Sequence, residues 1–289
     1  MNTSHYMLGS IAQALEYIQS ELREDRAPSL GDVARASGIS PYHFHRVFKL
    51  LTGETCAQVV QRLRLAKSTA ALQDPSISVT QAAMAAGYGS SQAYAKALRR
   101  ELADSASAMR ADPERLASAI RTLSEPDDER EAAARTARIQ ICSLDPLDVL
   151  LIKTEDKYPD LAETYGKLFE AAGGPQNVRA ALGLPQNDME LCEEEGFGFD
   201  AAVVLSDPKN LDCITIQGGL HLLVRHIGPD HGLNDTLNAI YGFALGKPGI
   251  AFRDLPNVYH YIDDPEEVVE TECRTDIYVP IDVSQGFVG

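Results

Sequence analysis

The sequence predicts a two-domain protein in which an all-helical first part precedes an α+β second part. Three observations point to this fold class. The 289 residues are enough for about two domains of ordinary size. Helical periodicity runs from Ile11 to Arg110, and after residue 137 it gives way to β-rich segments that alternate with helical ones. The hydrophobic content of 44% with 24% charged residues is typical of globular domains.

The composition narrows the class of protein. No uninterrupted apolar run reaches ten residues, whereas a membrane span needs roughly 20. The first ten residues have neither the basic segment nor the apolar stretch of a secretory signal. The 5 cysteines include no CxxC pair, which argues against a disulfide framework or a zinc ribbon. We therefore expect a protein of the reducing cytoplasm, without a membrane partner.

The net charge of -16 is distributed unevenly along the chain. The first 125 residues contain 14 Lys and Arg against 12 Asp and Glu, and the remainder contains 12 against 30. A uniformly acidic protein would repel nucleic acid, but this objection does not apply to the first part. The division suggests two partners of different kinds. The alternative is that the acidic part is merely well solvated.

The first part contains a pattern typical of a helix-turn-helix. A helix with one apolar face comes first, carrying Ile11, Leu15, Ile18 and Leu22. In the next helix Ala34 allows close helix approach, and Gly38 tolerates the positive φ that a tight turn requires. Ser40 is the expected N-cap of the helix that follows. The apolar face of that helix is predicted to consist of Phe44, Val47, Phe48 and Leu51.

The same pattern occurs a second time. Residues 78–88 repeat residues 29–39 at an offset of 49, and residues from Ser90 onward repeat those from Ser40 at an offset of 50. A predicted long helix, Val59 to Leu72, joins the two units and carries Arg62, Arg64 and Lys67. Two units joined in this way can place helices in successive major grooves, about 34 Å apart on one face of DNA.

A further set of residues lies at spacings typical of one family: Phe48-Lys49, Gly53, Arg62-Leu63-Arg64-Leu65-Ala66, Ala83, Gly87-Tyr88 and Ser90. On these residues, residues 8–110 resemble the DNA-binding domain of AraC-type transcription regulators. The second unit departs from the family pattern at its end, where Leu102-Ala103, Ala106 and Met109-Arg110 replace the usual Phe-Gly, Pro and Tyr-Arg.

The resemblance implies double-stranded DNA as a partner and places nine residues at the DNA. Outward positions of the first recognition helix are Tyr42, His43, His45, Arg46 and Lys49. The positions expected to enter the groove are Tyr42, His45 and Arg46, and in the second helix Ser91, Gln92 and Lys96. The expected phosphate contacts are Lys49, Arg99 and Arg100. The alternative for all nine is a solvated helix face. His43 and His45 point to different faces of a helix, so no metal site is expected there.

Residues 111–137 are predicted to connect the two domains. Asp112-Pro113 opens a short helical pattern through Arg121, and the segment 125–129 is a polar break with Pro and like charges. The predicted domains are therefore residues 5–110 and residues 138–289.

The second part reads as a β-α-β-β unit used twice, with two helices on one face of an antiparallel sheet. The predicted helices, Pro159 to Ala172 and Leu233 to Leu245, share one apolar template at an offset of 72. A cleft between the repeats is a natural ligand site. The predicted strands are Ile139 to Cys142, Val149 to Lys153, Phe197 to Leu205, Asp212 to Gln217, Leu220 to Ile227, Val258 to Tyr261 and Thr275 to Val279.

The second part contains three distinctive segments: Ile216-Gln217-Gly218-Gly219, His226-Ile227-Gly228-Pro229 and Asp276-Ile277-Tyr278-Val279-Pro280-Ile281. On these segments, residues 138–283 resemble the GyrI-like small-molecule-binding domain. Members that bind cationic drugs commonly carry a buried Glu where this chain has Tyr259. A tyrosine replaces the charge with stacking and cation–π attraction, so we expect a flat aromatic or weakly cationic effector. The candidate ligand residues are Tyr158, Tyr165, Tyr241, Tyr259 and Tyr261, each of which has a core or surface role as its alternative.

The pattern as a whole predicts a DNA-binding transcription regulator, an activator, whose second domain binds a small-molecule effector. No cofactor, metal or enzymatic activity is expected, because no Ser-His-Asp, Cys-His or metal constellation has an informative spacing. Two other functions stay open. One is a GyrI-like hydrolase of small electrophilic compounds fused to a DNA-binding domain. The other is a protein–protein module whose acidic part contacts RNA polymerase or another protein.

Overall fold

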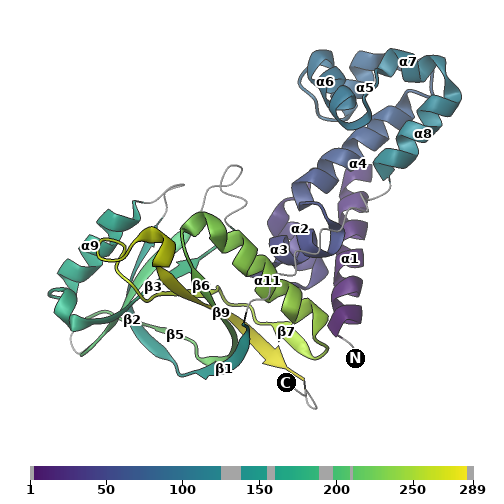
Figure 1. Ribbon diagram of the computed structural model, residues 1–289. Coiled ribbons are helices and arrows are strands. Elements are labelled where there is room, and N and C mark those ends of the chain that lie inside the picture. The colour runs from purple at the N-terminus through teal and green to yellow at the C-terminus, as the bar shows by residue number, and fades with distance from the viewer. Residues whose placement is uncertain (1–2, 125–137, 155–159, 189–197, 209–210, 285–289) are drawn as a thin grey trace. The chain divides into compact units, whose positions relative to one another are not determined.

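Figure 1 shows the computed structural model, which describes residues 3–124, 138–154, 160–188, 198–208 and 211–284. The chain forms two compact units. The helical unit consists of residues 11–37 and 48–131, and the sheet unit consists of residues 1–10, 38–47 and 132–289. The turn and the first half of the first recognition helix thus belong to the sheet unit. In the described part of the chain, no helix combines the length and the apolarity that crossing a membrane requires.

The helices confirm the two helix-turn-helix units. The glycines of the two turns adopt the same left-handed conformation, with φ of 68° at Gly38 and 78° at Gly87. The small residues Ala34 and Ala83 are both fully buried. The helices are α1 (Thr3–Arg23), α2 (Leu30–Ser37), α3 (Pro41–Thr52), α4 (Cys56–Ala71), α5 (Val79–Ala85), α6 (Ser91–Leu102), α7 (Ala106–Ala111) and α8 (Pro113–Ser124).

The two recognition helices begin differently. The Ser90 hydroxyl accepts a hydrogen bond from the backbone N–H of Ala93 and so caps α6. Ser40, expected to cap α3 in the same way, donates its hydroxyl proton to Asp254 Oδ1 at 2.8 Å. The first recognition helix therefore uses its N-terminal serine to bind another part of the sheet unit.

The core of the helical unit extends beyond residue 110. Leu116, Ala119 and Leu123 of α8 are buried in one cluster with Leu65 of α4 and Tyr94 of α6. The first half of the predicted connection is thus a packed helix, because its apolar residues recur on one face. The rest of the predicted connection, residues 125–137, lies outside the described residues.

The sheet unit confirms two repeats that meet at a central pair of strands. The strand order is β1-β6-β9-β8-β3-β4-β2-β5, all pairs are antiparallel, and β7 adds to β9. The order is symmetric about β8 and β3, which places the pseudo-twofold axis between these strands. The outermost strands are exchanged, since β1 pairs with β6 of the second repeat and β5 with β2 of the first. The strands are β1 (Gln140–Leu144), β2 (Leu147–Thr154), β3 (Val178–Pro185), β4 (Phe199–Leu205), β5 (Ile214–Ile216), β6 (Gly219–Ile227), β7 (Ile250–Phe252), β8 (Val258–Tyr261) and β9 (Arg274–Val283).

Two of these strands, β3 and β7, were not predicted. Apart from Val178, the central strand β3 has no β-branched residue and contains Ala, Gly and Pro, so its own sequence does not favour a strand. Pairing with β4 on one side and β8 on the other determines its conformation. The predicted helices are confirmed as α9 (Leu161–Ala171) and α11 (Leu233–Gly246).

Strand alternation gives the sheet two different faces. Leu150, Ile152, Ala201 and Val203 pack with Leu168 of α9 on one face. On that face the Tyr261 ring of β8 also meets the Tyr165 ring of α9, with 6.0 Å between their centroids. The opposite face carries a separate apolar cluster of Val149, Leu182, Leu184, Ala202 and Val258.

Gly183 of β3 lies at the junction of the repeats, where there is no room for a side chain. A Cβ at this position would lie 2.2 Å from Phe199 Cζ and 2.9 Å from the Tyr261 hydroxyl. We expect Gly183→Ala to lower the free energy of unfolding by about 1–3 kcal/mol, as overpacking does. The matched control is Gly166→Ala in α9, where nothing lies within 4 Å of the added Cβ. It should be neutral or stabilising by up to about 1 kcal/mol. Denaturant titrations of both variants test this, and equal effects would contradict the crowding at Gly183.

Candidate functional site

The second recognition helix presents polar side chains to solvent. In α6, Tyr94 and Leu98 are fully buried, whereas Gln92 and Lys96 are exposed. Arg99 and Arg100 are also exposed in the last turn, and Ser91 is half-buried in the first. The five residues predicted to contact DNA from this helix are therefore arranged around the side that faces away from the core.

The first recognition helix is different, because its predicted outward face is partly buried. Phe44, Val47 and Phe48 are fully buried, as expected, and Leu51 is half-buried. Tyr42 and Lys49 are half-exposed. The outward positions His43, His45 and Arg46, however, are only 0%, 2% and 5% exposed. The expectation that these three face solvent is wrong for this structure, because they pack against other parts of the sheet unit.

His43 is enclosed by α11 and by the segment after β7. Its Nε2 lies 3.0 Å from the Arg253 carbonyl oxygen, which only accepts, so Nε2 carries the proton. Its Nδ1 then accepts from the Tyr241 hydroxyl at 2.6 Å. Asn257 Nδ2 in turn donates to that hydroxyl at 3.2 Å. The Phe252 ring stacks on Tyr241 at 4.9 Å between centroids and lies 5.1 Å from the His43 ring.

Burial holds His43 in its neutral form. It lowers the pKa of His43 from 6.5 to about 4, although the Arg253 carbonyl and the Asp254 carboxylate oppose the shift. The neutral tautomer is the one that the two hydrogen bonds require.

Arg46 lies one turn further along α3 and is bound by three oxygen atoms. Its NH2 nitrogen donates to Asp188 Oδ1 at 2.5 Å and to Asn234 Oδ1 at 3.1 Å, and its NH1 nitrogen donates to Asn238 Oδ1 at 2.6 Å. The guanidinium carbon lies 5.9 Å from the centre of the Tyr241 ring, within cation–π range. Asn234, Asn238 and Tyr241 share one face of α11 because they are spaced at i, i+4 and i+7.

Asp188 is positioned by the base of the β3–β4 connection. The Gln186 backbone N–H donates to the Gly198 carbonyl at 2.7 Å, and the Gly198 N–H donates to Asn187 Oδ1 at 3.0 Å. The Gln186 side chain donates to Asp200 Oδ2 at 3.1 Å. These bonds tie the two residues that precede Asp188 to the start of β4, and Asp188 follows them toward α11 and α3.

The predicted ligand tyrosines lie in two neighbouring places. Tyr165 and Tyr261 meet beneath α9, and the Tyr165 hydroxyl donates to the Leu182 carbonyl at 2.7 Å. Tyr241 and Tyr259 lie near Arg46 and Asp188, whose charges act on the pKa of each. Burial raises the pKa of all four hydroxyls, so all four are neutral at pH 7. Tyr158 lies outside the described residues.

The structure thus brings together residues that the sequence assigned to different partners. Arg46, predicted to read DNA, lies with Tyr241 and Tyr259, predicted to bind an effector. The sequence reasoning missed Asp188, Asn234, Asn238 and Asn257. The one available signal was the Asn234–Asn238–Tyr241 spacing on the second repeat helix. Among the described residues, no group of three or more His, Cys, Asp or Glu is arranged to hold a metal ion.

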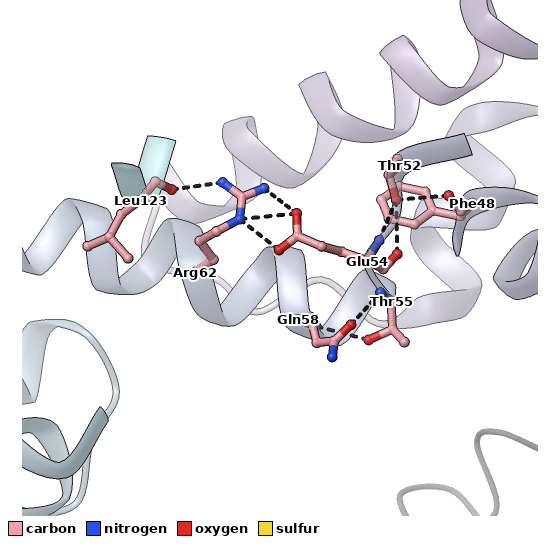
Figure 2. Close-up of polar contacts among 7 residues, drawn as sticks. All are labelled: Phe48, Thr52, Glu54, Thr55, Gln58, Arg62 and Leu123. Atoms are coloured by element: carbon pink, nitrogen blue, oxygen red, sulfur yellow. Dashed lines mark hydrogen bonds and ion pairs between the residues drawn. The ribbon is translucent and has the colours of Figure 1, made fainter. Parts of the chain in front are cut away.

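Arg62 of the connecting helix has a structural role (Figure 2). Its Nε and NH2 nitrogens donate to the Glu54 carboxylate at 2.7–3.1 Å, and its NH1 nitrogen donates to the Leu123 carbonyl at 2.8 Å. Glu54 follows the end of α3, where the Thr52 hydroxyl donates to the Phe48 carbonyl at 2.8 Å. Arg62 therefore joins α4 to the segment after α3 and to the last turn of α8.

We expect Arg62→Lys to lower the free energy of unfolding by about 1–3 kcal/mol, because an ammonium group cannot reproduce the bidentate geometry. Arg64→Lys, two residues along the same helix, is the matched control and should change it by less than about 0.5 kcal/mol. Denaturant unfolding of both variants measures the difference. Equal losses would show that the Arg62 geometry contributes nothing specific.

The depressed pKa of His43 makes the stability of the sheet unit depend on pH. His43 takes up a proton below pH 6.5 when unfolded but only near pH 4 when folded, so stability falls as pH falls through this window. The expected loss is on the order of 2 kcal/mol by pH 5. His43→Gln should lose less stability than the wild type between pH 7 and pH 5. His231→Gln, at an exposed histidine, should behave as the wild type. Parallel pH slopes for all three proteins in denaturant titrations would contradict the burial argument.

Comparisons with known proteins agree with both parts of the chain. A family model described as a helix-turn-helix domain matches residues 33–112, and one described as a GyrI-like small molecule binding domain matches residues 138–282. The transcriptional regulator Rob of Salmonella typhimurium is 28% identical over 293 residues, which cover 94% of this chain and 98% of that protein.

Two further similarities cover less of the chain. The probable transcriptional regulator YgiV of Escherichia coli K12 is 27% identical over 117 residues, which cover 39% of this chain and 73% of that protein. Among solved structures, a hydrolase from Listeria innocua is 11% identical, with coverage of 54% of this chain and 97% of that chain, at a TM-score of 0.38. The two helix-turn-helix units, the twofold sheet and the family matches lead to the same conclusion. The chain belongs to the AraC-type transcription regulators with a C-terminal GyrI-like small-molecule-binding domain.

Proposed function

We propose that this regulator reads DNA with α3 and α6 and responds to a small molecule bound on the helix-bearing face of the sheet unit. The observation that supports DNA reading most directly is the polar face of α6. Lys96, Arg99 and Arg100 are exposed there on the side opposite the buried Tyr94 and Leu98. A helix that buries one face and presents cationic and amide groups on the other suits a major groove.

We assign the contacts by chemistry. The assigned base readers on α6 are Ser91, Gln92 and Lys96, and those on α3 are Tyr42, His45 and Arg46. Gln92 offers a bidentate contact to adenine, and Arg46 offers one to guanine. Lys49, Arg99 and Arg100 are assigned to phosphates, which position the protein without reading sequence. His45 and Arg46 are buried in the structure, so reading by α3 requires that its polar face first be uncovered.

The proposed effector site includes Tyr165, Tyr241, Tyr259 and Tyr261. Tyr259 and Tyr261 alternate onto the helix-bearing face of the sheet, where Tyr165 contacts Tyr261 directly. Aromatic rings with neutral hydroxyls suit a flat aromatic or weakly cationic compound. We further propose that the chain acts by binding, without hydrolysing its ligand, and that it activates transcription through contact with RNA polymerase.

The α6 assignments separate base reading from phosphate contact. Gln92→Ala should weaken binding to the target duplex by about 1–3 kcal/mol and binding to a scrambled duplex much less. Arg99→Ala should weaken both equally and reduce the slope of log K against log salt by about 1. Arg179→Ala, at an exposed arginine of β3, is the control and should leave both affinities unchanged. Fluorescence anisotropy at several salt concentrations measures all three. Equal binding of target and scrambled duplexes by the wild type would overturn sequence reading itself.

A further inference from the structure

The groups around Arg46 form a set of acceptors directed at one buried point. The three oxygens that bind its guanidinium belong to Asp188, Asn234 and Asn238, at 2.5–3.1 Å. The side chains of Arg46 and Asp188 are each only 5% exposed. Because a guanidinium carries only donors, the two amides turn their oxygens toward it. A ligand for this set must therefore donate hydrogen bonds from neighbouring nitrogens and carry a positive charge.

An immobilised aromatic ring completes the site. Tyr241 lies within cation–π distance of the guanidinium, and its own position is determined from two sides. Its hydroxyl is bound by His43 and Asn257, and its ring stacks on Phe252. A ring held in this way favours a flat cation that lies against it.

The neighbouring histidine has unused hydrogen-bonding capacity. His45 is 2% exposed, and neither of its ring nitrogens makes a hydrogen bond. Its Nδ1 lies 3.4 Å from Asp188 Oδ2, the carboxylate oxygen on the side away from the Arg46 bond. Buried polar atoms are rarely left without a partner. A ligand larger than a guanidinium group thus has a further polar contact available here.

We infer that Asp188, Asn234, Asn238 and Tyr241 form a binding site for a small planar cation of the guanidinium or amidinium class, in which Arg46 is a tethered occupant. The inference rests on the proposed function, since the displacing cation is then the effector. A neutral ligand would not replace the attraction between the buried Asp188 carboxylate and the positive charge of Arg46. A compact ammonium lacks the two coplanar nitrogens that bind the three oxygens in the structure.

Occupancy of this site has a consequence for DNA reading. The Arg46 nitrogens bound to Asp188 and the two asparagines are the ones that a bidentate guanine contact would use. Arg46 cannot make both sets of bonds at once. A free cation in the site releases Arg46 for DNA, and DNA that engages Arg46 leaves the site open for the cation. Each ligand therefore raises the affinity for the other by the same factor.

Chemical rescue of the full chain tests the site. We expect Arg46→Ala to bind ethylguanidinium in a saturable manner at millimolar concentration, seen as a rise in Tm. N-ethylurea has the same planar shape without the charge, and ethylammonium has the charge without a planar group. Each should bind at least tenfold more weakly than ethylguanidinium. The double variant Arg46→Ala/Asp188→Asn should lose the rise. Arg225→Ala is the matched control, because Arg225 makes a bidentate pair with Asp276 that is half-exposed on the arginine side; it should show no saturable rise.

Three results would overturn the site: an equal rise with N-ethylurea, an equal rise in Arg225→Ala, or an undiminished rise in the double variant. If Arg46→Ala does not fold, calorimetry of the wild-type chain with benzamidine decides the matter. We expect binding that benzamide does not reproduce and that Asp188→Asn abolishes, and the absence of such binding counts against the site.

A DNA-binding measurement separates this inference from the proposed function. In the wild type, benzamidine should increase the affinity for the target duplex at least threefold, and in Arg46→Ala it should not. Rescue by ethylguanidinium without an effect of benzamidine on DNA affinity would support the cation site and overturn DNA reading by Arg46. Loss of target affinity in Arg46→Ala without any rescue would support DNA reading and overturn the cation site.

Discussion

The Asp188 carboxylate is only 5% exposed, and a carboxylate buried to this extent requires a positively charged partner. The arrangement of the functional residues depends on this requirement. The partner of Asp188 is Arg46, which belongs to the first recognition helix. Removing one partner of a buried ion pair typically costs about 3–5 kcal/mol. Within the sheet unit, the pair therefore connects the first half of α3 to the segment that follows β3. His43 and Ser40 add bonds from the same segment of chain.

The twofold construction of the sheet unit explains how such a pair is formed. The two repeats meet where β3 pairs with β8, and their helices α9 and α11 carry corresponding faces. The faces have diverged. Asn234 and Asn238 of the second repeat helix bind a cation, whereas the residues at the corresponding positions of the first repeat helix are Ala162 and Gly166. One symmetric framework thus provides an apolar region beneath α9 and an acceptor-lined region beside α11.

This arrangement bears on the function of the family to which the chain belongs. A regulator must connect occupancy of its ligand domain with occupancy of its DNA-binding domain, and the connection requires two states that a ligand distinguishes. In the mechanism inferred above, the two states differ in the partner of a single arginine, Arg46. The cationic residues of α6 face solvent, and the ion pair of Arg100 with Glu101 is itself exposed. The two recognition helices therefore have unequal parts in any response to a ligand.

The sequence by itself determined the elements that depend on local periodicity and turn chemistry. Gly38, the apolar face of α3 and the apolar template of each repeat helix could be predicted, because each depends on residues close together in the chain. Strand β3 could not be predicted from the sequence, since its conformation depends on pairing with the strands on both sides. The burial of His43, His45 and Arg46 could not be predicted from the sequence either. Periodicity assigns a face to a helix but not its partner, and only the tertiary structure brings Arg46 to residues 142 and 192 positions away.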